Sequence, residues 1–391
     1  MKSLPIGSFC KTGSGGTPSR SKIKEYYEGG DIPWIKSGEL AQDTILAAEE
    51  SITQKAVYES SAKVLAPGAI LVAMYGATVG QVSRLRIAAA TNQAICHIYP
   101  DTEVCEPDYL YRVLKGAKDR LLAKRVGGGQ PNISQTIIRE IPIPLPPLAE
   151  QKRIVAILDA ADALRAKRRE SLAQLGTLLQ STFLELFGDP VTNPKGWEQR
   201  LLGSICDVGS SKRVFVNELV ETGVPFFRGT EIGQLGDGRT VVPSLFITKE
   251  HYETLKAYSG VPQRGDLLLP SICEDGRIYS VKDDTPFYFK DGRVLWIKVH
   301  GSQIVSTFLK THLKQIFAKD YAKIASGTTF AELKIFALKD LLIHVPPINQ
   351  QLHFATITES IERQKTRLRT HLAELDALFA SLQSRAFNGQ L

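Results

Sequence analysis

One segment of this chain occurs twice, and the two copies begin two hundred positions apart. The first copy reads IPIPLPPLAEQKRIVAILDAAD from Ile141 to Asp162, and the second reads LLIHVPPINQQLHFATITESIE from Leu341 to Glu362. The match needs no gap, and it aligns Pro146, Pro147 and Gln151 with Pro346, Pro347 and Gln351. A gapless repeat of this length means that the fold must contain the same structural element twice.

Each copy is predicted to be one long helix. Proline cannot continue a helix from upstream but suits its first turn, so each Pro-Pro pair marks a helix start. Apolar residues then recur at steps of three and four, which is typical of a narrow coiled-coil seam. The seam residues are Ile154, Leu158, Ala161, Leu172, Leu175 and Leu179, and in the second copy Phe354, Ile357, Ile361, Leu368, Leu372, Leu375, Phe379 and Leu382. A helix of roughly 60 Å needs a partner for its seam. We expect the copies to pair antiparallel, because a globular region separates them in the chain.

The regions before the two helices also resemble each other, more loosely. GGDIPWIKSGEL (Gly29 to Leu40) is similar to ETGVPFFRGTEI (Glu221 to Ile232), and short apolar runs flanked by glycine predict strands in both regions. We therefore predict an α+β protein with an internal pseudo-two-fold repeat, made of two mixed α/β globular domains and two long antiparallel coiled-coil helices. The predicted boundaries are 1–145 and 188–345 for the globular domains, and 146–187 and 346–391 for the helices. The aromatic residues expected to serve the cores are Trp34, Trp197, Phe226 and Trp296.

No catalytic motif is recognisable in the chain. The glycine-rich stretch GSGGTPSRSK lacks the Gly-Lys-Ser/Thr ending of a phosphate-binding loop. TNPKGW has a lysine where the Asn/Asp-Pro-Pro-aromatic motif of adenine methyltransferases needs a second proline. We expect no catalytic, cofactor-binding or metal-binding residues. The chain has no apolar run long enough to span a membrane and no secretory leader, so we expect a cytoplasmic protein.

The whole chain resembles the specificity subunit of type I restriction-modification systems. The resemblance lies in the tandem arrangement and in five segments: Gly16-Thr17-Pro18-Ser19, Ile32-Pro33-Trp34-Ile35, Gly38-Glu39-Leu40, Ile143 to Ile154, and Val345 to Gln351. The second copy departs from the first in having Asn349-Gln350 in place of Ala149-Glu150, and no Thr-Pro-Ser precedes Pro225.

The resemblance implies a function. Each globular domain would be a target recognition domain that reads one half of a split, asymmetric sequence in double-stranded DNA, and the helices would space the two halves. Two modification subunits, which bind S-adenosylmethionine and methylate adenine, would dock on the helices. Restriction and translocase subunits, which use ATP and Mg²⁺, would join that complex. The specificity subunit itself would bind no cofactor, perform no chemistry and contact no membrane.

Candidate DNA contacts are basic, hydroxyl and amide side chains in glycine-containing loops, because phosphates and base edges are bound by such groups. The net charge of +7 is compatible with a polyanionic partner. In the first globular domain the candidates are Lys11, Thr12, Ser14, Thr17, Ser19, Arg20, Lys22, Lys24, Tyr75, Gln81, Arg84, Arg86, Gln130 and Asn132. In the second they are Ser210, Ser211, Lys212, Arg213, Arg228, Arg277, Thr328 and Thr329.

Other interpretations stay open at this point. A mobile surface loop is an equal alternative for the basic segment KTGSGGTPSRSKIK. The basic residues in the middle of each helix are either a solvated face or a second DNA contact, and they are Arg165, Lys167, Arg168, Arg169, Lys365, Arg367 and Arg369. The whole chain could instead be a non-catalytic two-domain scaffold without DNA readout, and a self-contained DNA-modifying enzyme is disfavoured by the missing motifs.

Overall fold

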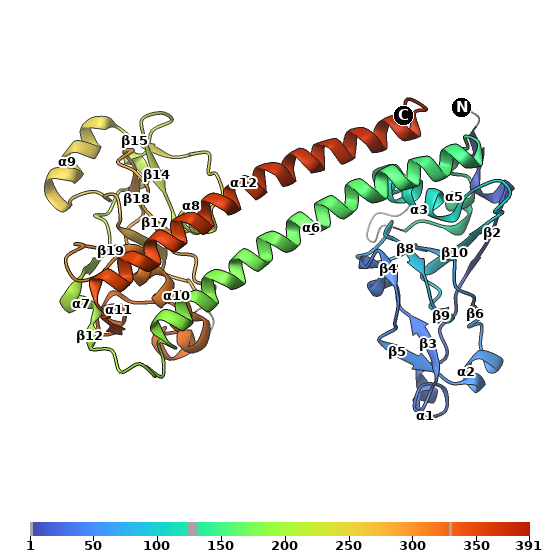
Figure 1. The fold of residues 1–391 in the computed structure, drawn as a ribbon, viewed down its shortest axis with the longest axis horizontal. Coiled ribbons are helices and arrows are strands. Elements are labelled where there is room, and N and C mark those ends of the chain that lie inside the picture. Colours follow the sequence, from blue (N-terminus) through green and yellow to red (C-terminus); the bar gives the residue numbers. More distant parts are fainter. Residues whose placement is uncertain (1–2, 124–131, 328–330) are drawn as a thin grey trace. The chain divides into compact units, whose positions relative to one another are not determined.

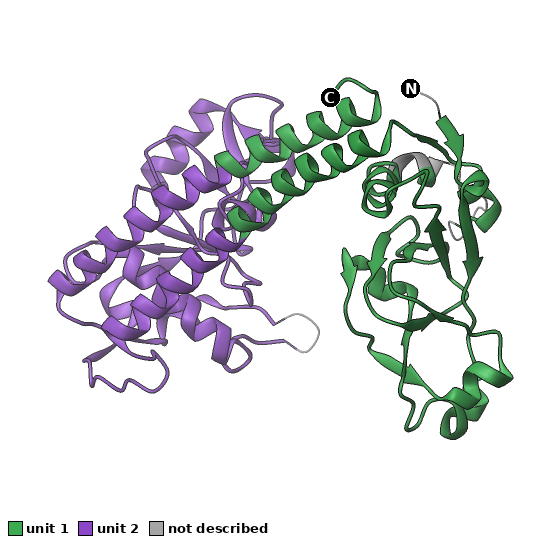
Figure 2. Ribbon diagram, turned by 45° about the vertical axis from the view of Figure 1, so that its right-hand side comes forward, with its two compact units in different colours: residues 1–169, 370–391 green, residues 170–369 purple. Residues whose placement is uncertain are grey.

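The computed structural model describes residues 3–123, 132–327 and 331–391, and it divides into two compact units (Figure 2). Unit 1 contains residues 1–169 and 370–391, and unit 2 contains residues 170–369. The unit boundaries, after 169 and after 369, are offset by the same two hundred positions as the sequence repeat. Each of the long helices, α6 (Leu148–Phe187) and α12 (Ile348–Phe387), contributes one half to each unit.

Unit 1 is built on three small sheets (Figure 1). Its strands are β1 (Ser3–Pro5), β2 (Cys10–Ser14), β3 (Ile32–Ile35), β4 (Thr44–Ile45), β5 (Glu50–Ile52), β6 (Val64–Leu65), β7 (Ile70–Ala73), β8 (Val82–Leu85), β9 (Ala89–Thr91), β10 (Ile95–Pro100) and β11 (Pro142–Pro144). Its shorter helices are α1 (Ile23–Tyr26), α2 (Gln54–Glu59), α3 (Pro107–Gly116), α4 (Lys118–Ala123) and α5 (Gln135–Arg139). The sheet orders are β2-β10-β7-β8-β4, β5-β3-β9-β6 and β1-β11.

Unit 2 has the same kinds of element. Its strands are β12 (Gln199–Leu201), β13 (Asp207–Gly209), β14 (Val224–Phe227), β15 (Phe246–Ile247), β16 (Leu267–Pro270), β17 (Tyr279–Ser280), β18 (Tyr288–Phe289), β19 (Val294–Lys298) and β20 (Leu342–His344). Its shorter helices are α7 (Leu202–Ile205), α8 (Gly229–Gly236), α9 (Lys249–Ser259), α10 (Ser306–Ile324) and α11 (Ile335–Lys339). The sheet orders are β13-β19-β16-β17, β15-β14-β18 and β12-β20.

The two units share one topology. The antiparallel order β2-β10-β7-β8 of unit 1 returns as β13-β19-β16-β17 in unit 2. The parallel pair β3–β9 returns as β14–β18, and the three-residue pair β1–β11 returns as β12–β20. The predicted α+β fold with an internal repeat is therefore confirmed.

Aromatic residues fill the cores largely as the sequence predicts. Trp34, Phe226 and Trp296 are buried. Trp197 is only half-buried, and its indole Nε1 donates to the carbonyl oxygen of Phe187 at the end of α6 (2.9 Å). Trp197 thus closes the chain reversal after α6.

A buried glutamine fixes the start of each long helix. The side chain of Gln151 accepts a hydrogen bond from the backbone nitrogen of Glu106 (2.8 Å) and donates to the carbonyl oxygens of Val104 (3.0 Å) and Pro146 (2.9 Å). In unit 2, Gln351 makes the matching bonds to Val305 N (2.8 Å), Gln303 O (3.2 Å) and Pro346 O (2.8 Å). Both glutamines are fully buried. The repeated Pro-Pro-x-x-x-Gln pattern therefore ties each helix start to the segment that leads into α3 or α10.

In unit 1 the start of α6 packs antiparallel against the end of α12. Arg165 of α6 forms an ion pair with Asp376 of α12 (2.6 Å), and its guanidinium lies 4.4 Å from the ring centre of Phe379. The buried Arg112 of α3 joins the same contact, since it bonds to Asp162 of α6 (2.9 Å). Burial would raise the pKa of Asp162, but the hydrogen bond from Arg112 lowers it overall.

In unit 2 the end of α6 packs against the start of α12 through aromatic rings. The ring centres of Phe183 and Phe187 lie 5.5 and 5.6 Å from that of Phe354. The antiparallel pairing predicted for the two helices is thus present in each unit (Figures 1 and 2). Among the helices of the described residues, none is long and apolar enough to cross a bilayer.

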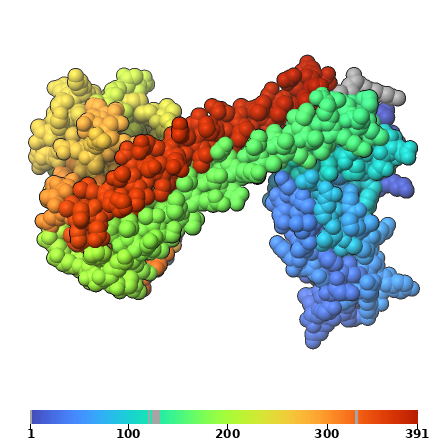
Figure 3. All heavy atoms as spheres, viewed as in Figure 1, coloured from blue at the N-terminus to red at the C-terminus, as the bar shows by residue number. Residues whose placement is uncertain are grey.

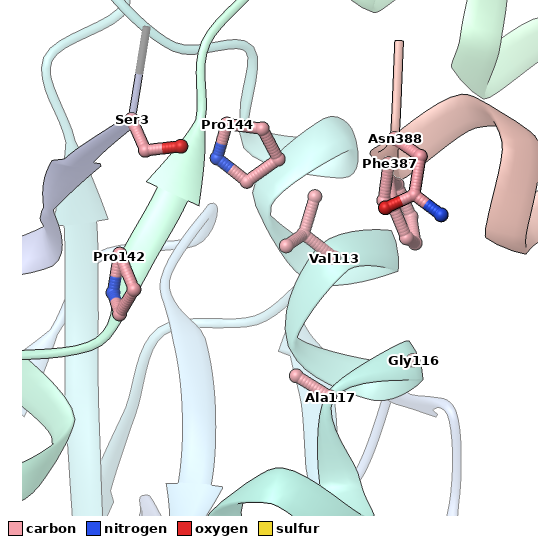
Figure 4. A pocket seen from close by; sticks show the side chains of 8 residues that line it. All are labelled: Ser3, Val113, Gly116, Ala117, Pro142, Pro144, Phe387 and Asn388. Carbon is pink, nitrogen blue, oxygen red and sulfur yellow. The ribbon is translucent and has the colours of Figure 1, made fainter. Parts of the chain in front are cut away.

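The packing behind α3 and α10 distinguishes the two units. In unit 1 a pocket of about 170 Å³ lies where α3, β11 and the end of α12 meet (Figure 4). Its lining residues are Ser3, Val113, Gly116, Ala117, Pro142, Pro144, Phe387 and Asn388.

If α3 and α10 are aligned through the two glutamine contacts, Glu106 matches Val305, and Val113 therefore matches the buried His312. Pro144 matches His344 through the strand register, and His344 is as buried as His312. Two imidazoles in unit 2 therefore take the places of two apolar side chains in unit 1.

Candidate nucleic-acid interface

The glycine-containing loop after β2 is packed against unit 1. The backbone nitrogen of Gly16 donates to Thr91 O (2.8 Å), and the indole of Trp34 donates to Gly16 O (3.0 Å). A Cβ atom at Gly16 would lie 2.4 Å from the backbone of Ser61, so only glycine fits there. The close packing favours an ordered loop, fixed against unit 1, over the alternative of a mobile surface loop.

Several polar candidates of this loop already have partners. Arg20 forms an ion pair with Glu50 (2.7 Å) and lies over the rings of Tyr27 (4.2 Å) and Trp34 (5.3 Å). Burial would raise the pKa of Glu50, but hydrogen bonds from Arg20 and Lys36 lower it overall. The remaining partnered candidates are Lys22 with Tyr26 and Glu59, Thr12 with Gln135, Thr17 with Gln93, and Ser19 with Ser21.

Three candidates of the same region are exposed and available. Lys11, Ser14 and Lys24 have no side-chain partner within the part of the chain that the structure describes. Lys11 and Ser14 lie in β2, and Lys24 lies in α1. An exposed side chain on such an element can approach a phosphate without breaking an internal contact. These three side chains are therefore the candidates of the segment 11–24 that are best placed for a ligand.

Arg84 in β8 and Arg86 directly after it share a structural partner. Arg84 and Arg86 each lie 3.1 Å from the carboxylate of Asp108 in the first turn of α3, and Arg84 also lies over the ring of Tyr111 (4.5 Å). They join α3 to the sheet. Of the remaining candidates in unit 1, Tyr75 and Asn132 are exposed, Gln81 is half-buried, and Gln130 lies outside the described residues.

Most candidates of unit 2 also have internal partners. The hydroxyls of Ser210 and Ser211 donate to Val294 O and Phe289 O (both 2.7 Å), which ties the segment after β13 to its neighbours. The other described candidates are Lys212, 4.7 Å from the ring centre of Tyr258, Arg213 with Asp291 (3.3 Å), Arg228 with Glu231 (2.7 Å), and Arg277 with Asp275 (2.5 Å). Thr328 and Thr329 lie outside the described residues. The cationic side chains of this set, Lys212, Arg213, Arg228 and Arg277, remain at least partly exposed.

Some basic residues in the middle of the long helices also form ion pairs within the protein. Arg165 bridges Asp162 and Asp376, and Lys365 pairs with Glu362 (2.9 Å). Their side chains are only 18% and 12% exposed. Figure 3 shows atoms of α6 and α12 at the surface along much of their length. The surface of these helices is thus open, but Arg165 and Lys365 are used mainly for packing and ion pairing.

The sequence analysis missed one basic cluster. Lys310 and Lys314 lie one turn apart on α10, and Lys282 follows β17. The charges of Lys314 and Lys282 both act on Lys310. The only signal in the sequence was the spacing of four between the two lysines of a predicted helix.

Comparison with known proteins agrees with this architecture. The family model described as type I restriction modification DNA specificity domain matches residues 1–174 and 194–375. The chain is 29% identical over 381 residues to the type I restriction enzyme MjaIX specificity subunit of Methanocaldococcus jannaschii, with 89% of this chain and 84% of that protein covered. It is 30% identical over 183 residues to the EcoR124I/EcoR124II specificity subunit of Escherichia coli, with 46% and 45% covered.

Two solved structures have a similar fold. One belongs to a study of complex assembly and conformational transition of the type I restriction-modification system (TM-score 0.63, 20% identity, 100% of this chain and 98% of that chain covered). The other is the crystal structure of the specificity subunit from M. genitalium (TM-score 0.59, 16% identity, 99% and 96% covered). With two matches to the family model, one in each copy of the repeated fold, this chain belongs to the DNA-binding specificity subunits of type I restriction-modification systems.

Proposed function

We propose that this chain reads a split, asymmetric sequence in double-stranded DNA, with one half read by each unit. The repeated topology carries this proposal, because two copies of one scaffold present different side chains at matching places. Lys11, which has no internal partner in the described residues of unit 1, is matched through the strand registers by Asp207 in unit 2. One chain can in this way recognise two unlike half-sites.

The long helices have a separate role in this proposal. They set the distance between the half-sites and provide the surface on which two adenine-methylating modification subunits dock. S-adenosylmethionine binds to those subunits, and ATP with Mg²⁺ binds to restriction subunits that join the complex. The chain supplies recognition and takes no part in bond making, in keeping with the absence of recognisable catalytic motifs in its sequence.

Methylation mapping tests this function. The full chain is reconstituted with its modification subunits, DNA of random sequence is methylated, and the modified adenines are located by sequencing. The expected result is one motif with two specified parts and an unspecified gap. Replacing the segment 11–24 is expected to change only one part. Methylation without any sequence preference would support the scaffold alternative and end the proposal.

The free lysines of unit 1 give a more local prediction. The double change Lys11→Gln and Lys24→Gln is expected to weaken duplex binding about three- to tenfold at moderate salt, with a salt slope reduced by at most about 2. The melting temperature should stay unchanged, because neither lysine has an internal partner within the described residues. Arg20→Gln is the contrast, since it breaks the contact with Glu50 and should lower the melting temperature. An unaltered DNA affinity in the double variant would remove these lysines from the interface.

A further inference from the structure

The lysine cluster of unit 2 combines three positive charges without a dedicated counter-charge. In residues 3–123, 132–327 and 331–391, no hydrogen-bond or ion-pair partner is found for the ammonium groups of Lys282, Lys310 or Lys314. The carboxylate charge that acts on Lys310 is that of Glu362, which already forms an ion pair with Lys365 (2.9 Å). The charge of Lys282 also acts on the neighbouring Asp283. The positive charge of the cluster is therefore only partly compensated.

Lys314 and Lys310 are both packed against the rest of unit 2. The stem of Lys314 packs along the turn before β17, where a Cβ atom on Gly276 would lie 3.2 Å from its Cγ. Lys310 is mostly withdrawn from solvent, and burial, followed by the charge of Lys314, lowers its pKa to about 8. An unpaired charge that is withdrawn from solvent costs stability, and groups with such shifted pKa values are more frequent at functional sites.

Unit 1 provides an internal comparison. The glutamine contacts align Glu106 with Val305, so Tyr111 matches Lys310, Lys115 matches Lys314, and Asp108 matches Thr307. The strand registers align Ile70 with Leu267 and therefore Arg84 with Ser280, so Arg86 matches Lys282 two residues later.

At this place each cation of unit 1 has a carboxylate partner, whereas the lysines of unit 2 have none within hydrogen-bond distance in the described residues. In unit 1, Arg84 and Arg86 share the carboxylate of Asp108 (both 3.1 Å), and Lys115 is paired with Asp43 (2.5 Å). In unit 2 a threonine stands at the position of Asp108, and a third lysine stands at the position of Tyr111. The same place on the fold is an internal salt-bridge network in one unit and an open cationic site in the other.

We infer that Lys282, Lys310 and Lys314 form a binding site for the phosphate backbone of the DNA held by unit 2, an inference that rests on the proposed function. Lysine ammonium groups bind phosphate as point charges and can converge on one anion. Such a contact positions the duplex on unit 2 without reading its sequence. It would also supply the negative charge that Asp108 and Asp43 provide in unit 1.

The test uses the full chain and a fluorescent duplex of about 40 base pairs, with binding followed by anisotropy from about 50 to 300 mM salt. The triple change Lys282→Gln, Lys310→Gln and Lys314→Gln is expected to weaken binding at least about tenfold at moderate salt and to reduce the salt slope by about 2 to 3. Lys115→Gln is the matched control in unit 1, and it should change the affinity less than about twofold.

The outcomes separate this site from the function itself. If the unaltered chain binds duplex DNA and the triple variant keeps its full salt slope, the phosphate site is wrong while DNA binding stands. If the unaltered chain does not bind duplex DNA, both ideas fall. A triple variant with normal DNA binding that no longer co-purifies with the modification subunits would overturn the inference by making the site a protein contact.

Two further measurements keep the test decisive. Lys310→Met is expected to raise the melting temperature and to weaken DNA binding, whereas a purely structural lysine would lower the melting temperature. If the triple variant does not fold, the double change Lys282→Gln and Lys314→Gln takes its place, because Lys282 is exposed and Lys314 is half-exposed. Stabilisation of the unaltered chain by inorganic phosphate with an unchanged DNA slope in the variants would assign the site to a free anion and overturn the inference.

Discussion

Replacing Gln151 by leucine is expected to lower the free energy of unfolding of unit 1 by about 2 to 4 kcal/mol, although leucine is a good helix former of similar size. The reason is the set of backbone groups that Gln151 satisfies. Its side chain accepts from Glu106 N and donates to Val104 O and Pro146 O. Because position 151 is fully buried, leucine would leave these three backbone groups without a hydrogen-bond partner.

The same change at Gln351 should have the same effect in unit 2. Gln351 binds Val305 N, Gln303 O and Pro346 O at nearly the same distances. Hydrogen exchange measured by mass spectrometry locates each effect, because faster exchange should appear in residues 104–110 for Gln151→Leu and in residues 303–309 for Gln351→Leu. The loss should be confined to the unit that carries the change.

Gln364→Leu is the matched control, since this glutamine is exposed on α12. Its effect on unfolding by urea should stay within about 0.5 kcal/mol. A Gln151→Leu variant as stable as this control would show that water replaces the lost contacts and that the repeated glutamine does not fix the helix start.

The helices were the most predictable part of this fold. The Pro-Pro pairs and the apolar spacing predict two long helices, and the globular region between them predicts their antiparallel pairing. The helices α6 and α12 begin directly after Pro147 and Pro347. These signals are local, because backbone restriction and helical periodicity depend on neighbouring residues. The repeat also aligns Gln151 with Gln351. The role of these two glutamines depends on hydrogen bonds to residues 45 to 48 positions away, which the sequence pattern does not show.

The candidate site was predictable only as a set of loops. Whether a cation is free depends on a carboxylate brought close by the fold. Arg20 is paired with Glu50, thirty residues away, and Arg86 with Asp108, whereas Lys24 has no such partner in the described residues. Each of these cations lies in a similar polar segment of the sequence, so no local pattern distinguishes a paired cation from an unpaired one. The lysines of unit 2 were overlooked for the same reason, since Lys282 and Lys310 come together only through the packing of α10 near β17.

Acidification from about pH 7 to about pH 4 is expected to destabilise unit 2 through His312 by about 3 kcal/mol. His312 is 1% exposed, and its ring lies 4.9 Å from that of the buried His344. Burial, followed by the charge of His344, lowers the pKa of His312 from 6.5 to about 3. Below pH 6.5 the unfolded chain binds a proton that the folded chain does not. Stability is therefore complete above pH 6.5 and falls until the pH reaches about 3.

His344 adds to this dependence in the same direction. Burial lowers its pKa, although the charge of Asp189 opposes this. Unit 1 has Val113 and Pro144 at the matching places and therefore lacks both imidazoles. The two units should accordingly respond differently to acid, with unit 2 losing its structure first.

His312→Leu isolates this effect. Leucine has a similar volume, and Nε2 of His312 is buried without a hydrogen-bond partner among the described residues. The variant should therefore be within about 1 kcal/mol of the original protein near pH 7. Urea unfolding is followed in a Trp34→Phe background, in which the two remaining tryptophans, Trp197 and Trp296, both lie in unit 2. His353→Leu, an exposed position on α12, is the matched control.

The difference between the two variants is what carries the conclusion. Carboxylates with lowered pKa values, such as Asp189 beside Lys319, also lose stabilising contacts in acid, and they do so equally in both variants. Subtracting the His353→Leu curve from the His312→Leu curve removes that shared contribution. The remaining difference should grow by about 1.4 kcal/mol for each pH unit below 6.5, which is the dependence expected from a single proton. Parallel curves from pH 7 to pH 4 would mean that His312 becomes charged within the folded protein, and its burial would then have to be relieved by local opening of the packing around Phe183 and Phe308.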